Sequence, residues 1–303
     1  MKIVVVGLGI QGNKRLKIAG NDAASTVDPV VRSAGYKKIE EVPLNLYDAA
    51  LVSVPDDAKY PIIKYLLSSG KHVLVEKPLL ISPGKIEELR ALASKKGLAC
   101  YTAYNHRFEP HIVRLKETIE KGVLGPLYLA KFFYGNGTAR DVKQSAWRDQ
   151  GPGVITDLGS HLLDTALFLF GKKELKLELC RAENFENQAP DYAMLASTGK
   201  PLLQFEMTFL SWKNTFRADI YGEKGSAHID GLCKWGPSVF SVRQRVLPSG
   251  KPAEESETLN CVDPTWEKEY AYFKQLCLSG KNNLDNDIRI QSMLSGLTEP
   301  VLK

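Results

Sequence analysis

The chain has 303 residues, of which 44% are hydrophobic and 25% are charged, values that suit one large or two ordinary globular domains. No uninterrupted apolar run reaches the roughly 18 residues of a membrane span, and the apolar run at residues 3–6 is too short for a signal core, so we expect a cytoplasmic protein with no membrane partner. The net charge of +5 comes from scattered basic residues and gives no support for a nucleic-acid partner.

The first 122 residues alternate between short apolar runs and helical patterns. We expect strands at 2–6, 25–28, 50–54, 72–75 and 98–102. Helices are expected at 10–19, at 58–69 before Gly70, and from about 83 to 96 before Gly97. Alternating strands and helices predict an α/β fold, with an N-terminal Rossmann domain over residues 1–122 built on a parallel sheet.

After Gly122 the pattern becomes rich in strands. Strands are expected at 127–134, 175–182, 192–197, 202–208, 216–221 and 226–229, around one long helix at 154–170. This pattern predicts a C-terminal α+β domain over residues 123–284 with a mostly antiparallel sheet, which would bind substrate and mediate oligomerisation. Helices at 264–279 and 285–297 end the pattern, and we expect the segment 285–303 to pack back on the first domain. One main covering helix leaves a sheet face to bury, so the sequence predicts a homo-oligomer.

A glycine-rich turn follows the first strand and opens the first helix. Gly7, Gly9 and Gly12 form the GxGxxG pattern, in which they would allow a tight turn, close approach of a pyrophosphate, and close packing of helix on strand. Asp28 ends the second strand, where a carboxylate accepts hydrogen bonds from an adenosine ribose. These features predict a dinucleotide site for NAD, with NADP as the alternative.

The fourth strand ends in Glu76-Lys77-Pro78, at the sheet edge where ligands of parallel sheets bind. With this turn, the chain resembles the glucose-fructose oxidoreductase, inositol dehydrogenase and MocA (Gfo/Idh/MocA) family. The resemblance rests, in chain order, on the GxGxxG turn, SGKHVLVEKPL at 69–79, YNHRF at 104–108, and WRDQGPGVITDLGSHLLD at 147–164.

The resemblance implies hydride transfer between a nicotinamide cofactor and a hydroxyl-bearing carbon of a sugar, cyclitol or sugar nucleotide. It implies a catalytic set of Lys77, Asp157 and His161, which also contact the substrate. The cofactor contacts that it implies are Gly7, Gly9, Ile10, Gln11, Gly12, Asp28, Pro55, Glu76, Lys77 and Asn105. The further substrate contacts are Arg107, Trp147 and Arg148.

The chain departs from the family pattern after the third strand. Family members commonly show Pro-x-x-x-His there, whereas this chain has Pro55-Asp56-Asp57-Ala58-Lys59. Lys59 takes the place of the histidine, and two acidic side chains lie near the expected phosphate site. The departure concerns the details of cofactor contact and leaves the reaction class unchanged.

Asp157 and His161 are spaced i,i+4, so a helix at 154–170 places both on one side. A carboxylate beside an imidazole favours its charged form, and histidine is suited to proton exchange near neutral pH. The glycines that precede this helix would permit close approach of a ligand, and His106 could face the same site, whereas His72 lies in a strand and is expected to be structural.

The sequence shows no pattern typical of a metal site or of a disulfide framework. No cluster of histidine, cysteine or carboxylate has metal-ligand spacing, so no metal is expected. The five cysteines are odd in number, widely spaced and without a CxxC pair, which predicts reduced and mostly buried thiols.

Two alternative functions stay open. One is a non-catalytic dinucleotide sensor with the same fold, which would need the glycine turn but not a proton-transfer set. The other is the same fold acting on an imine or a diene, whereas a lysine and histidine pair favours a hydroxyl or carbonyl group.

Overall fold

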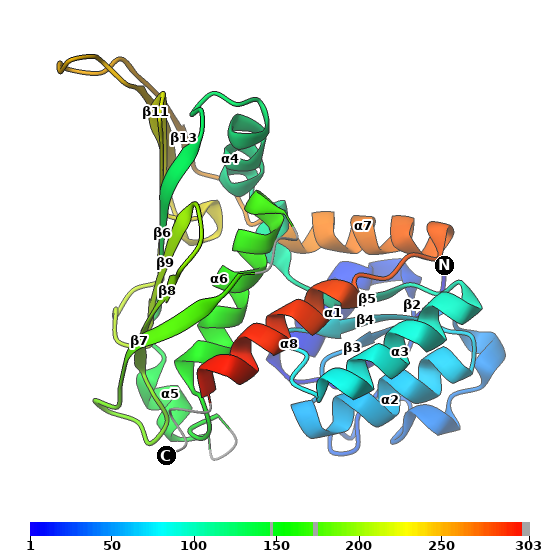
Figure 1. Cartoon of the computed structure of the whole chain (residues 1–303). Helices are drawn as coiled ribbons and strands as arrows, with labels where there is room; N and C mark the ends of the chain where they lie inside the picture. The colour runs from blue at the N-terminus through cyan, green and yellow to red at the C-terminus, as the bar shows by residue number, and fades with distance from the viewer. Residues whose placement is uncertain (146–147, 172–174, 299–303) are drawn as a thin grey trace. The chain divides into compact units, whose positions relative to one another are not determined.

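The computed structural model describes the chain except for residues 146–147, 172–174 and 299–303 (Figure 1). The described chain forms two compact units. Unit 1 comprises Met1–Asn105 and Trp266–Gln291, and unit 2 comprises His106–Thr265 and the chain from Ser292. The division of the chain at residue 122 into a dinucleotide-binding domain and a substrate-binding domain stays a prediction.

Unit 1 is built on a parallel sheet of five strands in the order β2-β1-β3-β4-β5. The strands are β1 (Ile3–Val6), β2 (Ala23–Val27), β3 (Ala49–Val52), β4 (His72–Glu76) and β5 (Cys100–Ala103). All the residues of β1 and β3 are buried, as continuous apolar runs in a sheet covered on both faces require. The expected Rossmann sheet is therefore confirmed, with strand ends that differ by one or two residues.

The helices of unit 1 lie on both faces of this sheet. They are α1 (Ile10–Ala19), α2 (Asp56–Ser68), α3 (Pro83–Lys96), α7 (Thr265–Ser279) and the first part of α8 (Leu284–Thr298). In Figure 1, α2 and α3 lie side by side on one face and α7 lies on the other. Gly97 ends α3 in the left-handed conformation, at φ 63°, as expected for a helix stop.

The start of one helix in unit 1 differs from expectation. Helix α2 begins two residues earlier than the apolar pattern indicates, because Asp56 and Asp57 occupy its first turn, where negative charge is favoured. The connection from β2 to β3 holds only the 3-10 turns η2 (Ile39–Glu41) and η3 (Leu44–Leu46).

Unit 2 is built on an eight-stranded sheet in the order β13-β12-β11-β10-β6-β9-β8-β7. The strands are β6 (Leu127–Gly135), β7 (Leu177–Glu183), β8 (Tyr192–Ser197), β9 (Leu202–Thr208), β10 (Thr215–Gly222), β11 (Gly225–Asp230), β12 (Ser238–Gln244) and β13 (Glu254–Leu259). Every neighbouring pair is antiparallel except β6 with β9. The mostly antiparallel sheet is confirmed.

Helices α4 (Pro110–Glu120) and α6 (Val154–Phe170) lie on the same side of the unit 2 sheet (Figure 1). Helix α6 packs on β6, β8 and β9, and α4 packs on β11 and β12. The stacked rings of Phe132 and Phe205, with centroids 5.4 Å apart, belong to the core beneath α6. A short helix, α5 (Ala139–Lys143), follows β6.

Three smaller expectations can be checked in these units. His72 is structural, because its Nδ1 accepts the backbone N–H of Ala99 at 2.9 Å. The thiols are free, but only Cys100 and Cys233 are buried, so the expectation of mostly buried cysteines is wrong. Over the described residues, the helices are too short or too polar to cross a bilayer.

Candidate functional site

The carboxyl ends of the unit 1 strands form one edge of the sheet. Pairing places Val27, Val6, Val52, Val75 and Thr102 in a single row across the five strands. The segments that follow this row therefore leave the sheet at the same edge, where ligands of open α/β sheets bind. Of the predicted residues, this edge carries Gly7, Asp28, Pro55, Glu76, Lys77 and Asn105.

The glycine-rich turn has the geometry that a dinucleotide requires. Gly7 has a φ of +86°, and a side chain there would lie 2.3 Å from the carbonyl oxygen of Ser53. A Cβ at Gly12 would lie 1.7 Å from the carbonyl oxygen of Gly7, so the helix packs against the turn only without a side chain. By contrast, a Cβ on Gly9 would meet nothing within 4 Å. The turn therefore leaves open space at the start of α1, where backbone N–H groups favour an anion.

Ile10 and Gln11, the first two residues of α1, are both exposed. Ile10 is 79% exposed, which is unusual for an apolar side chain in the first turn of a helix that packs on a sheet. Its place beside the open space at Gly9 fits a contact with a bound dinucleotide.

Asp28 is held firmly against the glycine-rich turn. Its Oδ2 accepts the backbone N–H of Leu8 at 2.8 Å, and its Oδ1 accepts those of Val30 and Val31 at 2.8 and 2.9 Å. Burial opposes ionisation of the carboxyl, but the N–H donors of Val31, Leu8 and Val30 outweigh it and lower the pKa of Asp28. The ribose-binding candidate is thus a fixed negative charge that also braces the phosphate turn.

The Glu76-Lys77-Pro78 turn is anchored on both sides of the lysine by buried cations. Arg15, which is 1% exposed, donates from Nε to Oε1 of Glu76 at 2.6 Å. Lys59, which is 3% exposed, donates from Nζ to the carbonyl oxygen of Pro78 at 2.6 Å. The turn that carries the candidate lysine is therefore tied to α1 and to α2.

The departure at Lys59 has a structural explanation. Its Nζ lies 2.6 Å from Oδ1 of Asp56, so the unexpected acid neutralises the unexpected base within the first turn of α2. Pro55 precedes both as the N-cap of this helix. Asp56 and Lys59 together therefore add no net charge near the expected phosphate site.

His161 of α6 lies within an aromatic cluster of unit 2. Its ring stacks on that of His106, with centroids 4.2 Å apart and an interplanar angle of 20°. The ring of Tyr134 meets His161 edge-on at 5.8 Å. Both histidines are nearly buried, at 7% and 1% exposure. The structure thus brings His106, which the sequence singled out only weakly, directly against the predicted proton-exchange residue.

Lys234 was missed by the sequence analysis. It follows β11 in the 3-10 turn η5 (Cys233–Trp235), and its Nζ lies 3.0 Å from Nε2 of His106. A lysine ammonium only donates, so Nε2 of His106 is the acceptor in this contact. No motif marks Lys234, because its role depends on a contact across 128 positions of the chain.

Two arginines predicted to contact substrate are paired with carboxylates of α6. Arg107 makes a bidentate contact with the buried Asp164, through Nε to Oδ2 at 2.8 Å and through Nη2 to Oδ1 at 2.6 Å. Arg148 contacts Oδ2 of Asp157 from Nη2 at 3.1 Å. Asp157 thus has a cationic partner that spacing alone did not predict. The predicted substrate contact Trp147 lies outside the described residues.

The glycine directly before α6, Gly153, packs within the protein. Gly153 has a φ of +52°, and a Cβ there would lie 2.3 Å from the carbonyl oxygen of Pro190. The N–H of Val154 donates to that same oxygen at 2.9 Å. Gly153 is therefore explained by close packing against the backbone before β8, a different reason from the approach of a ligand that the sequence suggested.

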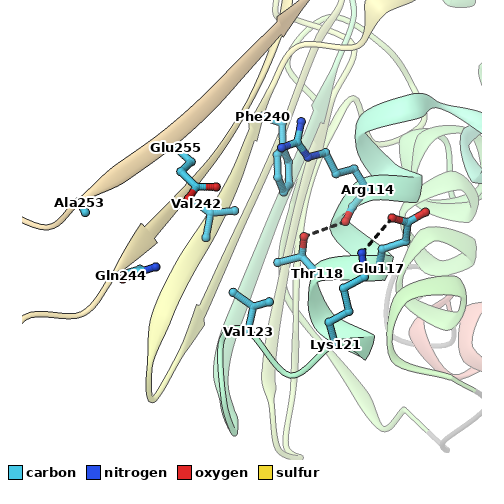
Figure 2. Close-up of a pocket in the computed structure, with 10 residues that line it drawn as sticks. All are labelled: Arg114, Glu117, Thr118, Lys121, Val123, Phe240, Val242, Gln244, Ala253 and Glu255. Carbon is cyan, nitrogen blue, oxygen red and sulfur yellow. Dashed lines mark hydrogen bonds and ion pairs between the residues drawn. The ribbon is translucent and has the colours of Figure 1, made fainter.

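A groove elsewhere in unit 2 contains none of the predicted residues. Figure 2 shows it between α4 and the strands β12 and β13. Its lining residues are Arg114, Glu117, Thr118, Lys121, Val123, Phe240, Val242, Gln244, Ala253 and Glu255. Its cations have acidic partners, since Lys121 lies 3.6 Å from Glu117 and Arg114 pairs with Glu257. In the part of the chain that the structure describes, no three histidine, cysteine or acidic side chains gather as metal ligands do.

Family models match both parts of the chain. Residues 1–104 match the model described as oxidoreductase family, NAD-binding Rossmann fold. Residues 112–228 match the model described as GFO/IDH/MocA C-terminal domain.

Curated relatives match over shorter stretches. An uncharacterized oxidoreductase of Schizosaccharomyces pombe is 35% identical over 140 residues, which are 45% of this chain and 37% of the relative. The scyllo-inositol 2-dehydrogenase (NADP(+)) of Bacillus subtilis is 27% identical over 48% of this chain and 41% of its own length. The D-glucoside 3-dehydrogenase of Escherichia coli is 30% identical over 43% of this chain and 37% of its own length. The matches thus span about two fifths of the length of these relatives.

Solved structures extend the likeness of fold to the whole chain. A levoglucosan dehydrogenase in complex with NADH superposes with a TM-score of 0.85 at 15% identity, covering 100% of this chain and 97% of that one. At this identity the likeness concerns the fold alone. The two family models, which together match residues 1–104 and 112–228, show that this chain belongs to the Gfo/Idh/MocA family of oxidoreductases, with an NAD-binding Rossmann domain at its N-terminus.

Proposed function

We propose that this protein transfers a hydride between a nicotinamide cofactor and a hydroxyl-bearing carbon of a sugar, cyclitol or sugar nucleotide. The observation that carries the proposal is the anchored Glu76-Lys77-Pro78 turn at the ligand-binding edge of a Rossmann sheet with an open phosphate turn. The relatives named for inositol and glucoside dehydrogenation support a polyhydroxylated substrate.

The residues of this chain would divide the work as follows. The phosphate turn and Asp28 would hold the dinucleotide, whose nicotinamide supplies or accepts the hydride when bound. Lys77 would donate a hydrogen bond to the reacting oxygen, and His161 would exchange the proton of that hydroxyl. Asp157, with Arg148 beside it, would orient the substrate or the histidine.

A substrate panel tests this proposal. Sugars, cyclitols and sugar nucleotides are offered with NAD and with NADP, and the absorbance of the reduced nicotinamide is followed. Turnover of at least one CH–OH compound is expected. Tight binding of dinucleotide without turnover of any of these classes would instead favour a sensor.

Cofactor preference is expected to favour NAD. Asp28 is ionised and fixed, so it would accept hydrogen bonds from a ribose 2′-hydroxyl and repel the 2′-phosphate of NADP. We expect NAD to bind about tenfold more tightly, which corresponds to about 1.4 kcal/mol. The exposed Arg32 can offset part of the repulsion of a phosphate.

Calorimetry with both cofactors on the wild type and on Asp28→Ala checks this. The variant should narrow the gap between the two dissociation constants. The variant should also bind NAD and NADP more weakly than the wild type, because the N–H of Leu8 loses its acceptor and the phosphate turn loses its brace. Equal wild-type constants for NAD and NADP would contradict the preference.

Assembly is expected to bury the face of the unit 2 sheet opposite α4 and α6. On β6 and β10, this face carries Lys131, Phe133, Arg217 and Asp219, while the alternate residues of both strands are buried under the helices. We predict at least a homodimer. Light scattering at micromolar concentration checks the mass, and Phe133→Asp should lower it. A monomeric wild type would reject the prediction.

A further inference from the structure

The turn after β4 depends on a lysine that is almost entirely buried. Lys59 on α2 is 3% exposed, and its Nζ lies 2.6 Å from the carbonyl oxygen of Pro78 and 2.6 Å from Oδ1 of Asp56. Pro78 directly follows Lys77 in the chain. The contact therefore joins the first turn of α2 to the backbone next to the candidate lysine.

A buried ammonium in this place needs an explanation, because removing a charge from water is costly unless it is paired and hydrogen-bonded. Burial is the largest effect and lowers the pKa of Lys59 overall, whereas the charge and hydrogen bond of Asp56 act in the opposite direction and raise it. Asp56 thus favours the charged form, and the ammonium reaches a backbone oxygen that an apolar side chain would leave unsatisfied.

The opposite side of Lys77 is held in a comparable way. Arg15 binds the Glu76 carboxylate at 2.6 Å, so the residues immediately before and after Lys77 each contact a buried cation from a helix. Lys77 therefore lies between an anchored side chain at Glu76 and an anchored backbone carbonyl at Pro78. A residue so confined presents its side chain in a narrow range of positions, as a site for proton transfer or hydrogen bonding requires.

We propose that Lys59 is a positioning residue for Lys77. Its ammonium fixes the Pro78 carbonyl, and Asp56 keeps that ammonium in place. The inference rests on the proposed function, in which Lys77 donates to the reacting oxygen. Lys59, the residue that departs from the family pattern, would thus help to place Lys77 against the substrate and would have no part in binding the dinucleotide.

The test compares Lys59→Met with Lys64→Met in the full-length protein. Both lysines lie on α2, but Lys64 is about half exposed and pairs with Glu88 at the surface. Lys59→Met should lower kcat by about 10²-fold, as small displacements of reacting groups do. Its dissociation constant for NADH and its KM for that cofactor should stay close to wild type. Lys64→Met should leave kcat unchanged.

Hydrogen–deuterium exchange gives a readout that needs no substrate. The peptide spanning residues 76–81 should exchange faster in Lys59→Met than in wild type or Lys64→Met. Lys59→Arg retains a donor and a charge, so it should recover part of the lost kcat. If Lys59 had only a structural role, its loss would lower kcat and NADH affinity together, and arginine would not restore kcat alone.

Several outcomes would overturn the inference. The inference fails if a folded Lys59→Met variant has wild-type kcat, or if its residues 76–81 exchange as slowly as in the wild type. It also fails if the variant loses kcat and NADH affinity equally. If Lys59→Met does not fold, Asp56→Ala decides, because loss of the partner of Lys59 should raise exchange and lower kcat in the same direction. If Lys77→Ala were fully active while exchange still rose in Lys59→Met, the catalytic role proposed for Lys77 would fail but the anchoring contact would stand.

Discussion

Replacing Lys77 or His161 by alanine is expected to lower kcat by about 10²- to 10⁴-fold, the usual contribution of a general acid or base. Dinucleotide binding should survive in both variants, because the phosphate turn is packed by Gly7 and Gly12 without help from either side chain. The double variant should lose little more than each single one, since residues that act on the same oxygen fail together.

Steady-state kinetics with a substrate from the panel, together with NADH binding, checks this expectation. Lys85→Ala on α3 and His228→Ala on β11 are matched controls, since neither belongs to the proposed set. Full activity in both the Lys77→Ala and the His161→Ala variants would reject the mechanism and favour a sensor or a different active site.

Asp157→Asn should cost less than either of these changes if the carboxylate only orients its neighbours. The substitution also leaves Arg148 without its anionic partner, so the local charge becomes more positive. A positive charge disfavours protonation of a nearby imidazole, and the acid limb of the pH–rate profile should therefore move to lower pH.

The largest loss of stability is expected from removing Arg15. This guanidinium is 1% exposed and lies 2.6 Å from Glu76 and 2.7 Å from the fully buried Glu269, under the ring of Trp266 at 4.2 Å. Arg15→Met would leave a buried carboxylate without its cation, a change that typically costs about 3–5 kcal/mol of unfolding free energy. Urea unfolding measures the loss.

Arg90→Met is the matched control for this variant. Arg90 pairs with Glu87 and Asp285 at 2.5 and 2.7 Å, but its side chain is 39% exposed. Exposed pairs contribute only about 0–1 kcal/mol, so this variant should unfold almost as wild type does. A loss in Arg15→Met no larger than that in Arg90→Met would show that the buried network contributes little.

The loss in Arg15→Met should depend on pH. Burial raises the pKa of Glu269 from its ordinary 4.5 to about 7, and Arg15 lowers it. Since the folded state holds this proton more tightly than the unfolded chain, the carboxyl contributes stability below about pH 4.5 that is lost as the pH rises through about 7. Without Arg15 the pKa of Glu269 rises further, so the variant should continue to lose stability above about pH 7, where the loss in the wild type levels off. The opposite trend would reject this account.

Local patterns in the sequence were sufficient to predict most of the fold. Continuous apolar runs identified β1 and β3, and Gly97 marked the end of α3, because burial and left-handed backbone are properties of single positions. The strand β13 (Glu254–Leu259) was missed, because its first five residues are all polar and the strand is held by pairing with β12 rather than by burial. Helix α4 was also missed, although Glu109 caps it by accepting the N–H groups of His111 and Ile112.

The candidate site divides in the same way. By itself, the sequence determined the glycine turn, the acid at the end of β2 and the lysine at the end of β4, since each depends on residue type at a fixed place relative to a strand. Only the tertiary structure decided that Lys59 holds Pro78, that Arg15 joins Glu76 to Glu269, and that Lys234 meets His106. The hydrophobic periodicity of the sequence indicates whether a residue is buried, but it does not indicate which distant group that residue contacts. That choice is made when strands and helices pack and each buried charge must find its partner.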